Sequence, residues 1–276
     1  MNALEIRGLT KRRGDFALQG LDLTLPAGCI MGLIGENGAG KSTTIRLILN
    51  ALSRDGGTVA VYGKDNRALT PLEREDIGAV LDEVGLPEYM TARQIGRMMA
   101  GIFTRWQPEV YRDYLRRLAL PEDKPFRDFS RGMKMKLGLA VALSHQPKLL
   151  LLDEATSGLD PVVRDEILTI FADFTRDEEH AVLISSHIVS DLEKICDYIA
   201  FLHRGRLLLC EEKDRLTEEY GILRGDTDGI APAAVCGRHT TPYGTEYLVR
   251  RDAVPVGMAL GQVNIEDLFV FMAKEA

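Results

Sequence analysis

Two adjacent carboxylates, Asp153 and Glu154, follow four leucines in the run LLLLDEATSGLD, residues 149–160. Neighbouring carboxylates repel each other, and a buried charge needs a partner. Taken alone, the run fits a functional acid pair and a strand that ends in a surface loop equally well. Other residues of the chain must decide between these two interpretations.

A glycine-rich segment, GENGAGKS at 35–42, supplies a partner for these acids because it matches the pattern GxxxxGK[ST]. Its glycines let backbone N–H groups point inward as an anion site at a helix N-terminus. Lys41 can reach the β- and γ-phosphates of a nucleotide, and the Ser42 hydroxyl can ligate Mg²⁺. The alternative is a glycine-rich turn with an unrelated lysine. The position between an apolar run, CIMGLI, and a helical pattern at 41–52 favours phosphate binding, and the predicted ATP-binding residues are Gly35, Glu36, Asn37, Gly38, Ala39, Gly40, Lys41, Ser42 and Thr43.

A nucleoside triphosphate with Mg²⁺ gives the two acids separate roles. In open α/β sheets, ligands bind at the carboxyl ends of the strands, and Gly35, Asp153 and His187 each follow an apolar run. We expect Asp153 to hold Mg²⁺ directly or through water, and Glu154 to orient and deprotonate the attacking water. His187 can hydrogen-bond the γ-phosphate or steer that water. A histidine at a strand end is otherwise often structural.

The elements around these residues predict an α/β protein. Residues 1–65 alternate as antiparallel strands do, whereas CIMGLI, KLLLLD and HAVLISSH are apolar runs separated by helical patterns, as in βαβ units. Residues 86–129 predict helices, with a capping box at Thr91 and Gln94 and a helix from Pro108 that ends before Pro121. From about 216 the pattern changes to a hairpin around Pro242-Tyr243-Gly244 and a closing helix capped by Asn264.

Composition disfavours several classes of protein. The 276 residues are 45% hydrophobic and 27% charged, with a net charge of −7, which disfavours a non-specific nucleic-acid binder. Four scattered cysteines form no CxxC pair and suit a reducing cytoplasm. The N-terminus lacks an apolar signal region, and no apolar run approaches the 18 or so residues of a membrane helix. A role at a membrane would therefore need a span from another chain.

Residues 1 to about 215 resemble the ATP-binding cassette family, the nucleotide-binding subunits of ABC transporters. Residues 35–42 resemble its Walker A motif, LLLLDE its Walker B motif, SGLD with Asp160 its D-loop, and His187 its switch histidine. The most specific match is to the LSGGQ signature, and it comprises Phe129, Ser130, Arg131, Gly132 and Met133. In the family this segment faces the γ-phosphate of a second subunit, so that a head-to-tail dimer encloses two ATP molecules.

Several residues depart from the family pattern. Asp82 stands at the position of the Q-loop glutamine, and the adenine-stacking tyrosine aligns near Arg13, which leaves Phe16 as the nearby aromatic residue. Arg131 and Met133 replace a glycine and a glutamine of the signature, and Ala155 replaces the usual proline. A carboxylate at position 82 can still approach Mg²⁺ or its water, but it is shorter than glutamine and charged.

The resemblance implies a P-loop (RecA-like) core with an antiparallel β-subdomain, an inserted helical subdomain at about 86–129, and a small α+β C-terminal extension at 216–276. It implies Mg²⁺-dependent ATP hydrolysis that drives a bacterial transporter, with motifs similar to those of ABC-2 type exporters. The expected partners are a separately encoded membrane permease and a second copy of the ATPase, without nucleic acid. The expected location is cytoplasmic, on the inner face of the plasma membrane.

Two other functions stay open at this point. A soluble ABC-type ATPase that acts on ribosomes or DNA would usually carry two cassettes, basic arms or a coiled coil, which this sequence does not display. A P-loop kinase for a small molecule would need an acceptor pocket, but neither the signature nor SGLD.

Overall fold

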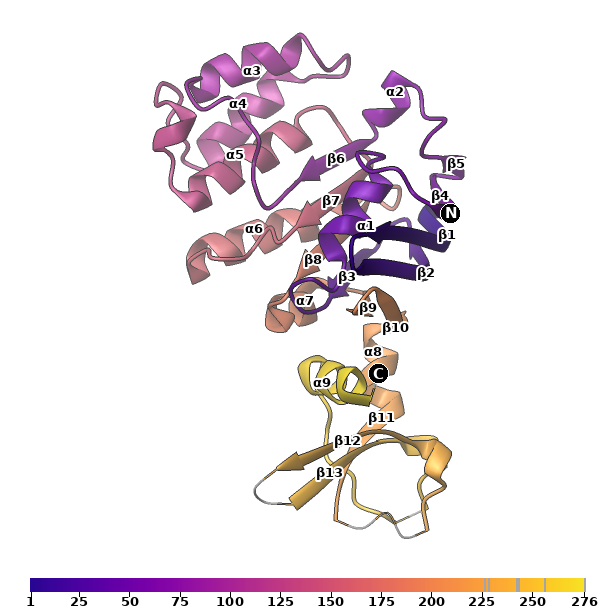
Figure 1. Ribbon diagram of the computed structural model, residues 1–276. Coiled ribbons are helices and arrows are strands. Elements are labelled where there is room, and N and C mark those ends of the chain that lie inside the picture. The colour runs from indigo at the N-terminus through magenta and orange to yellow at the C-terminus, as the bar shows by residue number, and fades with distance from the viewer. Residues whose placement is uncertain (226, 228, 242–243, 256, 276) are drawn as a thin grey trace.

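The computed structural model describes residues 1–276 except 226, 228, 242–243, 256 and 276. Its centre is a six-stranded sheet in the order β10-β9-β3-β8-β7-β6 (Figure 1). Five strands are parallel, and only β10 runs antiparallel to its neighbour β9. The strands are β3 (Ile30–Ile34), β6 (Ile77–Val80), β7 (Leu149–Asp153), β8 (Ala181–Ser186), β9 (Tyr198–His203) and β10 (Arg206–Glu212). All five residues of β3 and of β7 are buried, because layers cover both faces of the sheet.

One layer is a second, antiparallel sheet in the order β2-β1-β4-β5. Its strands are β1 (Asn2–Arg13), β2 (Phe16–Pro26), β4 (Gly56–Val61) and β5 (Lys64–Asp65). Alternate residues of β1 and β2, such as Leu4, Ile6, Leu23 and Leu25, share one apolar core with β3 and with helix α1 (Lys41–Ile48). The predicted antiparallel N-terminal sheet is therefore present, and α1 lies at this interface.

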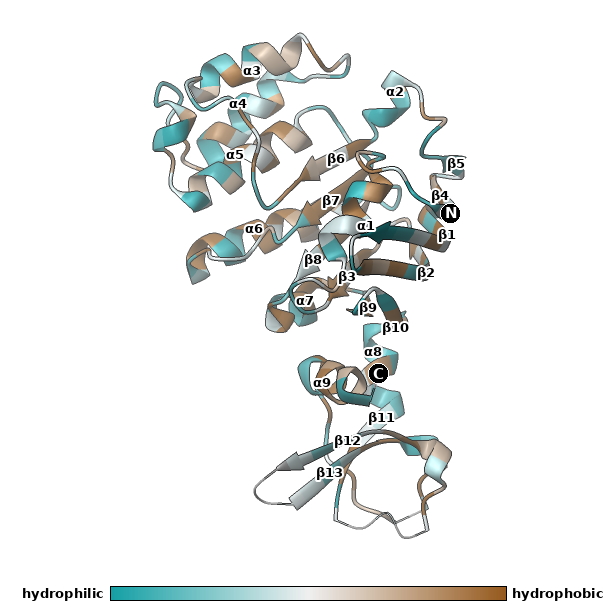
Figure 2. Cartoon of the chain, in the orientation of Figure 1, coloured by the Kyte–Doolittle hydropathy of each residue, from teal (hydrophilic) through white to brown (hydrophobic). Residues whose placement is uncertain are grey.

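Helices cover the opposite face and extend away from the sheet. They are α2 (Pro71–Arg74), α3 (Ala92–Ala100), α4 (Pro108–Arg117), the 3₁₀ turn η1 (Phe126–Asp128), α5 (Arg131–Leu143), α6 (Pro161–Phe174) and α7 (Val189–Ile195). Thr91 caps α3 through the predicted capping box with Gln94, and Pro108 occupies the first turn of α4. Figure 2 shows β6 and β7 in the hydrophobic colour range between these helices and the first layer. The predicted α/β class with an inserted helical block is confirmed.

Two helices end earlier than their apolar spacing predicts. Helix α1 ends at Ile48 rather than Leu52, and α4 ends at Arg117 rather than Leu120. In each case a left-handed residue follows, Asn50 at φ 54° and Ala119 at φ 51°. The N–H of the next residue then bonds the carbonyl five positions back, which closes a Schellman turn. Because neither residue is glycine, the sequence gives little sign of these ends.

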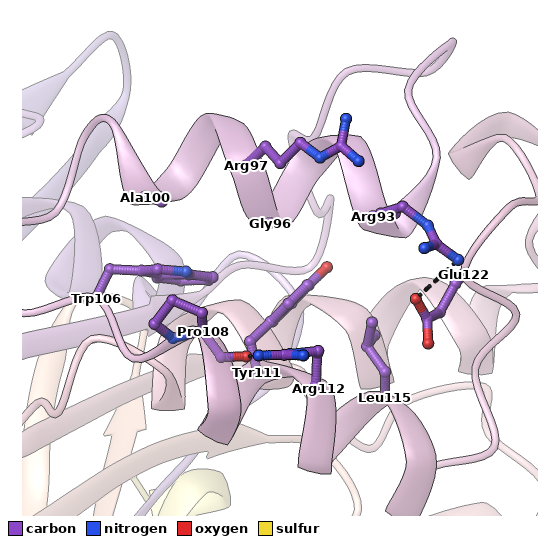
Figure 3. A pocket seen from close by; sticks show the side chains of 10 residues that line it. All are labelled: Arg93, Gly96, Arg97, Ala100, Trp106, Pro108, Tyr111, Arg112, Leu115 and Glu122. Atoms are coloured by element: carbon purple, nitrogen blue, oxygen red, sulfur yellow. Dashed lines mark hydrogen bonds and ion pairs between the residues drawn. The ribbon is translucent and has the colours of Figure 1, made fainter.

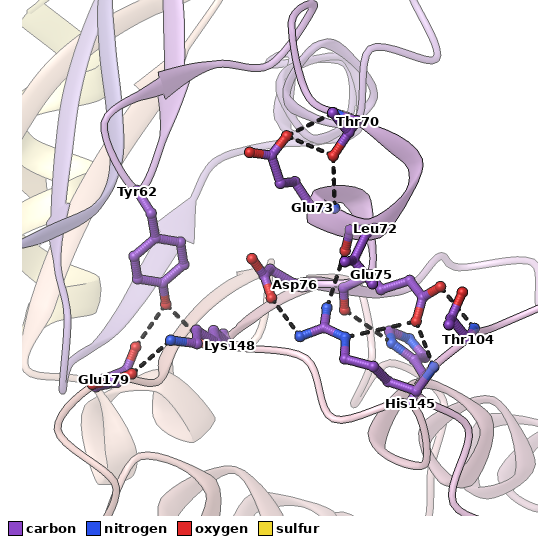
Figure 4. Close-up of polar contacts among 11 residues, drawn as sticks. Tyr62, Thr70, Leu72, Glu73, Glu75, Asp76, Thr104, His145, Lys148 and Glu179 are labelled. Atoms are coloured by element: carbon purple, nitrogen blue, oxygen red, sulfur yellow. Dashed lines mark hydrogen bonds and ion pairs between the residues drawn. The ribbon is translucent and has the colours of Figure 1, made fainter.

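A polar cluster joins the helical block to the core (Figure 4). Glu75, just after α2, accepts N–H bonds from Thr104 and Arg105 at 2.8 and 2.9 Å, and Arg105 also donates to Asp76 at 2.7 Å. The buried His145 ring bonds the Glu75 carbonyl at 3.1 Å and stacks on Phe103 at 4.1 Å between ring centroids. Burial opposes ionisation of Glu75, but the two N–H groups outweigh it and hold its pKa below the usual value.

The cluster makes stability depend on pH through His145. Burial lowers the pKa of His145 below its ordinary value of 6.5. The unfolded chain therefore binds the proton first, so stability is complete above about pH 6.5 and falls as the pH drops toward the folded pKa. We expect Tm to decrease more between pH 7.5 and 5 in the parent chain than in His145→Gln, measured by calorimetry. An equal decrease in both proteins would show that protonation of His145 does not cause the loss of stability at low pH.

The C-terminal segment forms a three-stranded antiparallel sheet, β11-β13-β12, covered by a helix. Its elements are α8 (Lys213–Glu219), β11 (Tyr220–Arg224), η2 (Pro232–Ala234), β12 (Val235–Thr241), β13 (Gly244–Arg250), η3 (Arg251–Ala253) and α9 (Ile265–Glu275). The predicted hairpin is β12–β13, although Pro242 and Tyr243 of its turn lie outside the described residues. Asn264 caps α9 as expected, accepting from the Asp267 N–H at 2.7 Å.

The C-terminal helix also joins this small sheet to the core. Leu268 and Phe271 of α9 belong to the main apolar core, and the Ile265 N–H donates to Glu193 of α7 at 2.8 Å. The domain division at residues 215 and 216 stays a prediction. No helix in the part of the chain that the structure describes is long and apolar enough to cross a membrane.

Candidate nucleotide-binding and catalytic site

The loop between β3 and α1 has a shape that only glycine permits at two positions. A Cβ at Gly35 would lie 2.4 Å from the Leu202 carbonyl oxygen, so β9 leaves no room for a side chain. Gly40 has φ 113°, and a Cβ there would lie 2.8 Å from the Phe16 ring. The backbone therefore curls around the N-terminus of α1, where unpaired N–H groups and the helix dipole favour an anion.

Lys41, the first residue of α1, is buried inside this curl. Its Nζ donates to the carbonyls of Gly35 and Glu36 at 2.6 and 3.2 Å, and lies 3.3 Å from Glu154 Oε1. The ammonium is thus held by two dipoles and one carboxylate. Phosphate oxygens can replace that carboxylate as its counter-charge.

The two acids of the opening run have different surroundings. Asp153 ends β7, is 2% exposed, and accepts a hydrogen bond from Ser185 Oγ of β8 at 2.6 Å. Glu154 follows with a left-handed backbone, φ 53°, and its N–H donates to Ser185 at 3.1 Å. Such a conformation is costly for a side chain with a Cβ, and residues held this way cluster at functional sites. The two carboxylates accordingly have different partners, Ser185 for Asp153 and the pair Lys41 and His187 for Glu154.

The Glu154 carboxylate contacts both Lys41 and His187. Besides the contact of Oε1 with Lys41, its Oε2 lies 2.6 Å from Nδ1 of His187, which follows β8. The sequence predicts that Glu154 activates the attacking water and that His187 either hydrogen-bonds the γ-phosphate or steers that water, and the structure brings the two side chains into direct contact. Both carboxylate oxygens are engaged in this state.

Sequence reasoning missed Ser185, which positions both acids. Its hydroxyl donates to Asp153, and its carbonyl accepts from Glu154. Ser185 is fully buried in a strand that is otherwise apolar up to this point. A hydroxyl inside such a run, directly opposite Asp153 in the sheet, is the signal that could have identified it.

A cavity of about 400 Å³ opens beside the loop, and we call it the nucleotide pocket. Its lining residues are Arg13, Phe16, Glu36, Asn37, Gly38, Gly40, Lys41, Ser42, Thr43, Asp82 and Glu154. Phe16 and Arg13, the two candidates for contact with the base, therefore lie at this pocket, as does Asp82. Gly35, Ala39, Asp153 and His187 are not among the lining residues, although His187 contacts the lining residue Glu154.

The donors around the pocket fit Mg²⁺. Ser42 and Asp153 offer hydroxyl and carboxylate oxygens, the ligands that this hard cation prefers. Within the described residues, no group of three or more His, Cys, Asp or Glu side chains could form a complete metal cage. Mg²⁺ usually keeps several waters and is bound by one or two protein ligands together with substrate phosphates.

The signature residues lie at the start of α5, outside the lining of the nucleotide pocket. Ser130 is the N-cap, and its Oγ accepts from the Met133 N–H at 3.3 Å. Gly132 faces Val163 and Leu159, whose Cγ1 and Cδ2 atoms lie 3.6 and 3.7 Å from the position of a Cβ. Asp160 caps α6, accepting from the N–H groups of Val162 and Val163 at 3.2 and 3.1 Å. Within one chain, Arg131 reaches a pocket residue through an ion pair with Asp82 at 2.9 Å.

A second hollow, of about 350 Å³, lies between α3 and α4 (Figure 3). Trp106, Tyr111 and Leu115 form part of an apolar floor, and Arg93, paired with Glu122, stands at its edge. It shares no lining residue with the nucleotide pocket and contains no glycine-rich loop. The glycine-rich loop and Lys41 line the nucleotide pocket instead.

Comparisons with known proteins agree with this geometry. Residues 18–157 match the family described as ABC transporter. The chain is 32% identical over 218 residues to the ABC transporter ATP-binding protein YtrB of Bacillus subtilis, covering 79% of this chain and 74% of that protein. It is 31% identical over 275 residues to the bacitracin transport ATP-binding protein BcrA of Enterococcus faecalis, covering 95% and 87%.

A solved ATP-binding subunit of an ABC transporter superposes with a TM-score of 0.71 at 26% identity, over 78% of this chain and 92% of that one. A nucleotide-free ATP-binding cassette, at 21% identity and a TM-score of 0.66, shares the fold. The chain belongs to the ABC transporter family and is one of its ATP-binding, ATP-hydrolysing subunits.

Proposed function

We propose that this subunit is the motor of a bacterial exporter of the ABC-2 type, working with a separately encoded membrane permease. The observation that carries the proposal is the similarity to the bacitracin transport ATP-binding protein, which covers 95% of the chain and so includes its C-terminal sheet. A lantibiotic transport ATP-binding protein of Streptococcus pyogenes is also 32% identical over 214 residues. The proposed location is the inner face of the plasma membrane.

We assign the hydrolytic roles as follows. The loop N–H groups and Lys41 bind the β- and γ-phosphates, and this releases Glu154 Oε1 from Lys41. Glu154 then accepts the proton of a water that attacks the γ-phosphorus, and the β–γ bridging oxygen leaves with ADP. His187, 2.6 Å from Oε2, holds the carboxylate in place. Mg²⁺ bound by Ser42 and Asp153 would neutralise charge on the phosphates.

A second copy of the chain completes the site in this proposal. Ser130, Gly132 and Met133 lie at a positive helix end, but they do not line the nucleotide pocket of their own chain. A head-to-tail dimer would place them against the γ-phosphate of the other copy, so that ATP holds the two chains together. Each ATP would then be bound by residues that follow β3, β7 and β8 of one chain and by the start of α5 of the other.

The permease contact is proposed on the side of the molecule where α2 meets the helical block. Leu72 of α2 and Ile102, just after α3, are 54% and 62% exposed, although both are large and apolar. They lie on segments that Arg105 ties together, since its guanidinium donates to the Leu72 carbonyl at 3.3 Å. Exposed apolar side chains at such a joint suit a membrane partner that moves the block relative to the core.

Exchange of these side chains for acids tests the proposal. We expect Leu72→Asp with Ile102→Asp to abolish co-purification with the permease from solubilised membranes, while ATP hydrolysis by the isolated subunit stays within about twofold. Thr217→Asp, on the exposed side of α8, is the control and should retain the permease. Recovery of the parent chain without a membrane partner, or on ribosomes, would contradict the proposal.

A further inference from the structure

Two residues that depart from the family pattern contact each other. Arg131 Nη2 donates to Asp82 Oδ1 at 2.9 Å, across 49 positions of sequence. Asp82 lies just after β6 and lines the nucleotide pocket, whereas Arg131 begins α5 beside Ser130. The pair therefore links the pocket directly to the first turn of the signature helix.

The same guanidinium also contacts the segment that follows Glu154. Gly158 has φ 67°, and a Cβ there would lie 3.0 Å from Nη1 and 3.3 Å from Cζ of Arg131. Gly158 stands two residues before Asp160, which caps α6. Arg131 thus joins three segments: the loop of Asp82, the start of α5, and the connection from Glu154 to α6.

Each charge is unfavourable without the other. The Asp82 carboxylate lines a pocket that already contains Glu36 and Glu154 and that must receive a polyanion. Arg131 places a cation at the positive end of a 13-residue helix whose first turn contains no acid. Together the two side chains neutralise each other, which gives a physical reason for both departures to occur in one chain.

The pair is easily exchanged for other partners. Both side chains are 53% exposed, and an ion pair this accessible to water contributes little to stability. A triphosphate carries more negative charge than one carboxylate, and a guanidinium binds phosphate in the same forked geometry as carboxylate. Phosphate can therefore displace Asp82 from Arg131, because the ion pair is weak and phosphate binds the same guanidinium with more charge.

We infer that Asp82 and Arg131 form an exchangeable ion pair that holds the signature helix against the nucleotide pocket and releases Arg131 to the phosphates of the ATP in a second copy. The inference rests on the proposed dimer. Arg131 is a positioning residue before exchange and a phosphate contact after it.

A double-mutant cycle tests the inference, with Asp82→Gln, Arg131→Gly and the combination of the two. Arg131→Gly alone leaves the Asp82 charge uncompensated in the pocket, so affinity for a fluorescent non-hydrolysable ATP analogue should fall by about fourfold, the scale of like charges roughly 8 Å apart near a surface after screening by physiological salt over about one Debye length. The double variant should regain the parental affinity. Arg131→Lys, which keeps the charge, should retain affinity close to that of the parent.

The dimer provides a second readout. In a Glu154→Gln background, Asp82→Gln frees Arg131 from its partner in the same chain, so the ATP concentration for half-maximal dimer should fall, whereas Arg131→Gly should raise it. The control cycle uses Arg93 and Asp123, an exposed pair at 3.1 Å within the helical block, and should change neither quantity.

Additive effects of the Asp82 and Arg131 changes on affinity would overturn the inference while leaving ATP binding and dimer formation by the parent chain intact. Absence of an ATP-dependent dimer in the Glu154→Gln chain itself would instead overturn the proposed dimer and, with it, the release of Arg131 to a second copy. Tm of each variant, expected within a few degrees of the parent, excludes misfolding as the cause.

Discussion

Glu154→Gln is expected to lower ATP hydrolysis by about 10²-fold or more, the usual scale for loss of a general base, and to leave ATP binding intact. Glutamine keeps the size of the side chain between Lys41 and His187 but cannot accept the proton of the attacking water. With ATP bound and uncleaved, the dimer should persist, because a ligand that binds only the closed state stabilises it. Phosphate release and size-exclusion chromatography with Mg²⁺-ATP and with ADP measure both effects.

The control for this variant is Glu179→Gln, the same change at an exposed acid that pairs with Lys148 on another surface. It should hydrolyse ATP at the parental rate and show no persistent dimer. Undiminished hydrolysis by Glu154→Gln, together with a monomer under both nucleotides, would contradict the role given to Glu154 and the ATP-dependent dimer.

Asp153→Asn is expected to fail at an earlier step, because it weakens the binding of Mg²⁺-ATP itself. Loss of even an outer-shell partner of a metal ligand typically costs about 10- to 100-fold in metal affinity, so loss of a ligand charge should cost at least about tenfold. Affinity for ATP in the presence of a chelator should change much less. Isothermal titration with and without Mg²⁺ separates the two quantities.

Ser185→Ala provides the matched variant for that measurement. It keeps the Asp153 carboxylate but removes the 2.6 Å hydrogen bond that orients it, so we expect an intermediate loss of Mg²⁺-dependent affinity. If Asp153→Asn weakens ATP binding equally with and without Mg²⁺, Asp153 has a structural role rather than a metal-binding one.

The parts of the site that could be predicted depend on local pattern. The phosphate loop needs glycine at defined positions between a buried strand and a helix, and this requirement is visible in residues 35–42. The acids at 153 and 154 could be placed because parallel strands bring their carboxyl ends to one edge of the sheet. The antiparallel N-terminal sheet, the inserted helices and the cap at Asn264 follow from equally local signals.

Contacts between distant loops could not be predicted in the same way. Asp82 and Arg131 meet only because the loop after β6 and the start of α5 converge in three dimensions, and neither residue lies in an apolar pattern that would define its direction. The sequence predicts that Lys41, Glu154 and His187 lie at the same edge of the sheet. It does not predict that Glu154 contacts both of the others, because that contact depends on the attraction between their side chains.

The position of β3 in the sheet determines when the phosphate loop can form during synthesis. Both neighbours of β3 come much later in the chain, since Ile30 pairs with Val182 of β8 and Met31 with Tyr198 of β9. A ribosome that adds about 5–20 residues per second needs roughly 8–30 s to reach them. During that time the apolar run CIMGLI has two unpaired edges in the nascent chain, where it can aggregate. Nucleotide binding therefore cannot protect the emerging chain until most of it has left the ribosome.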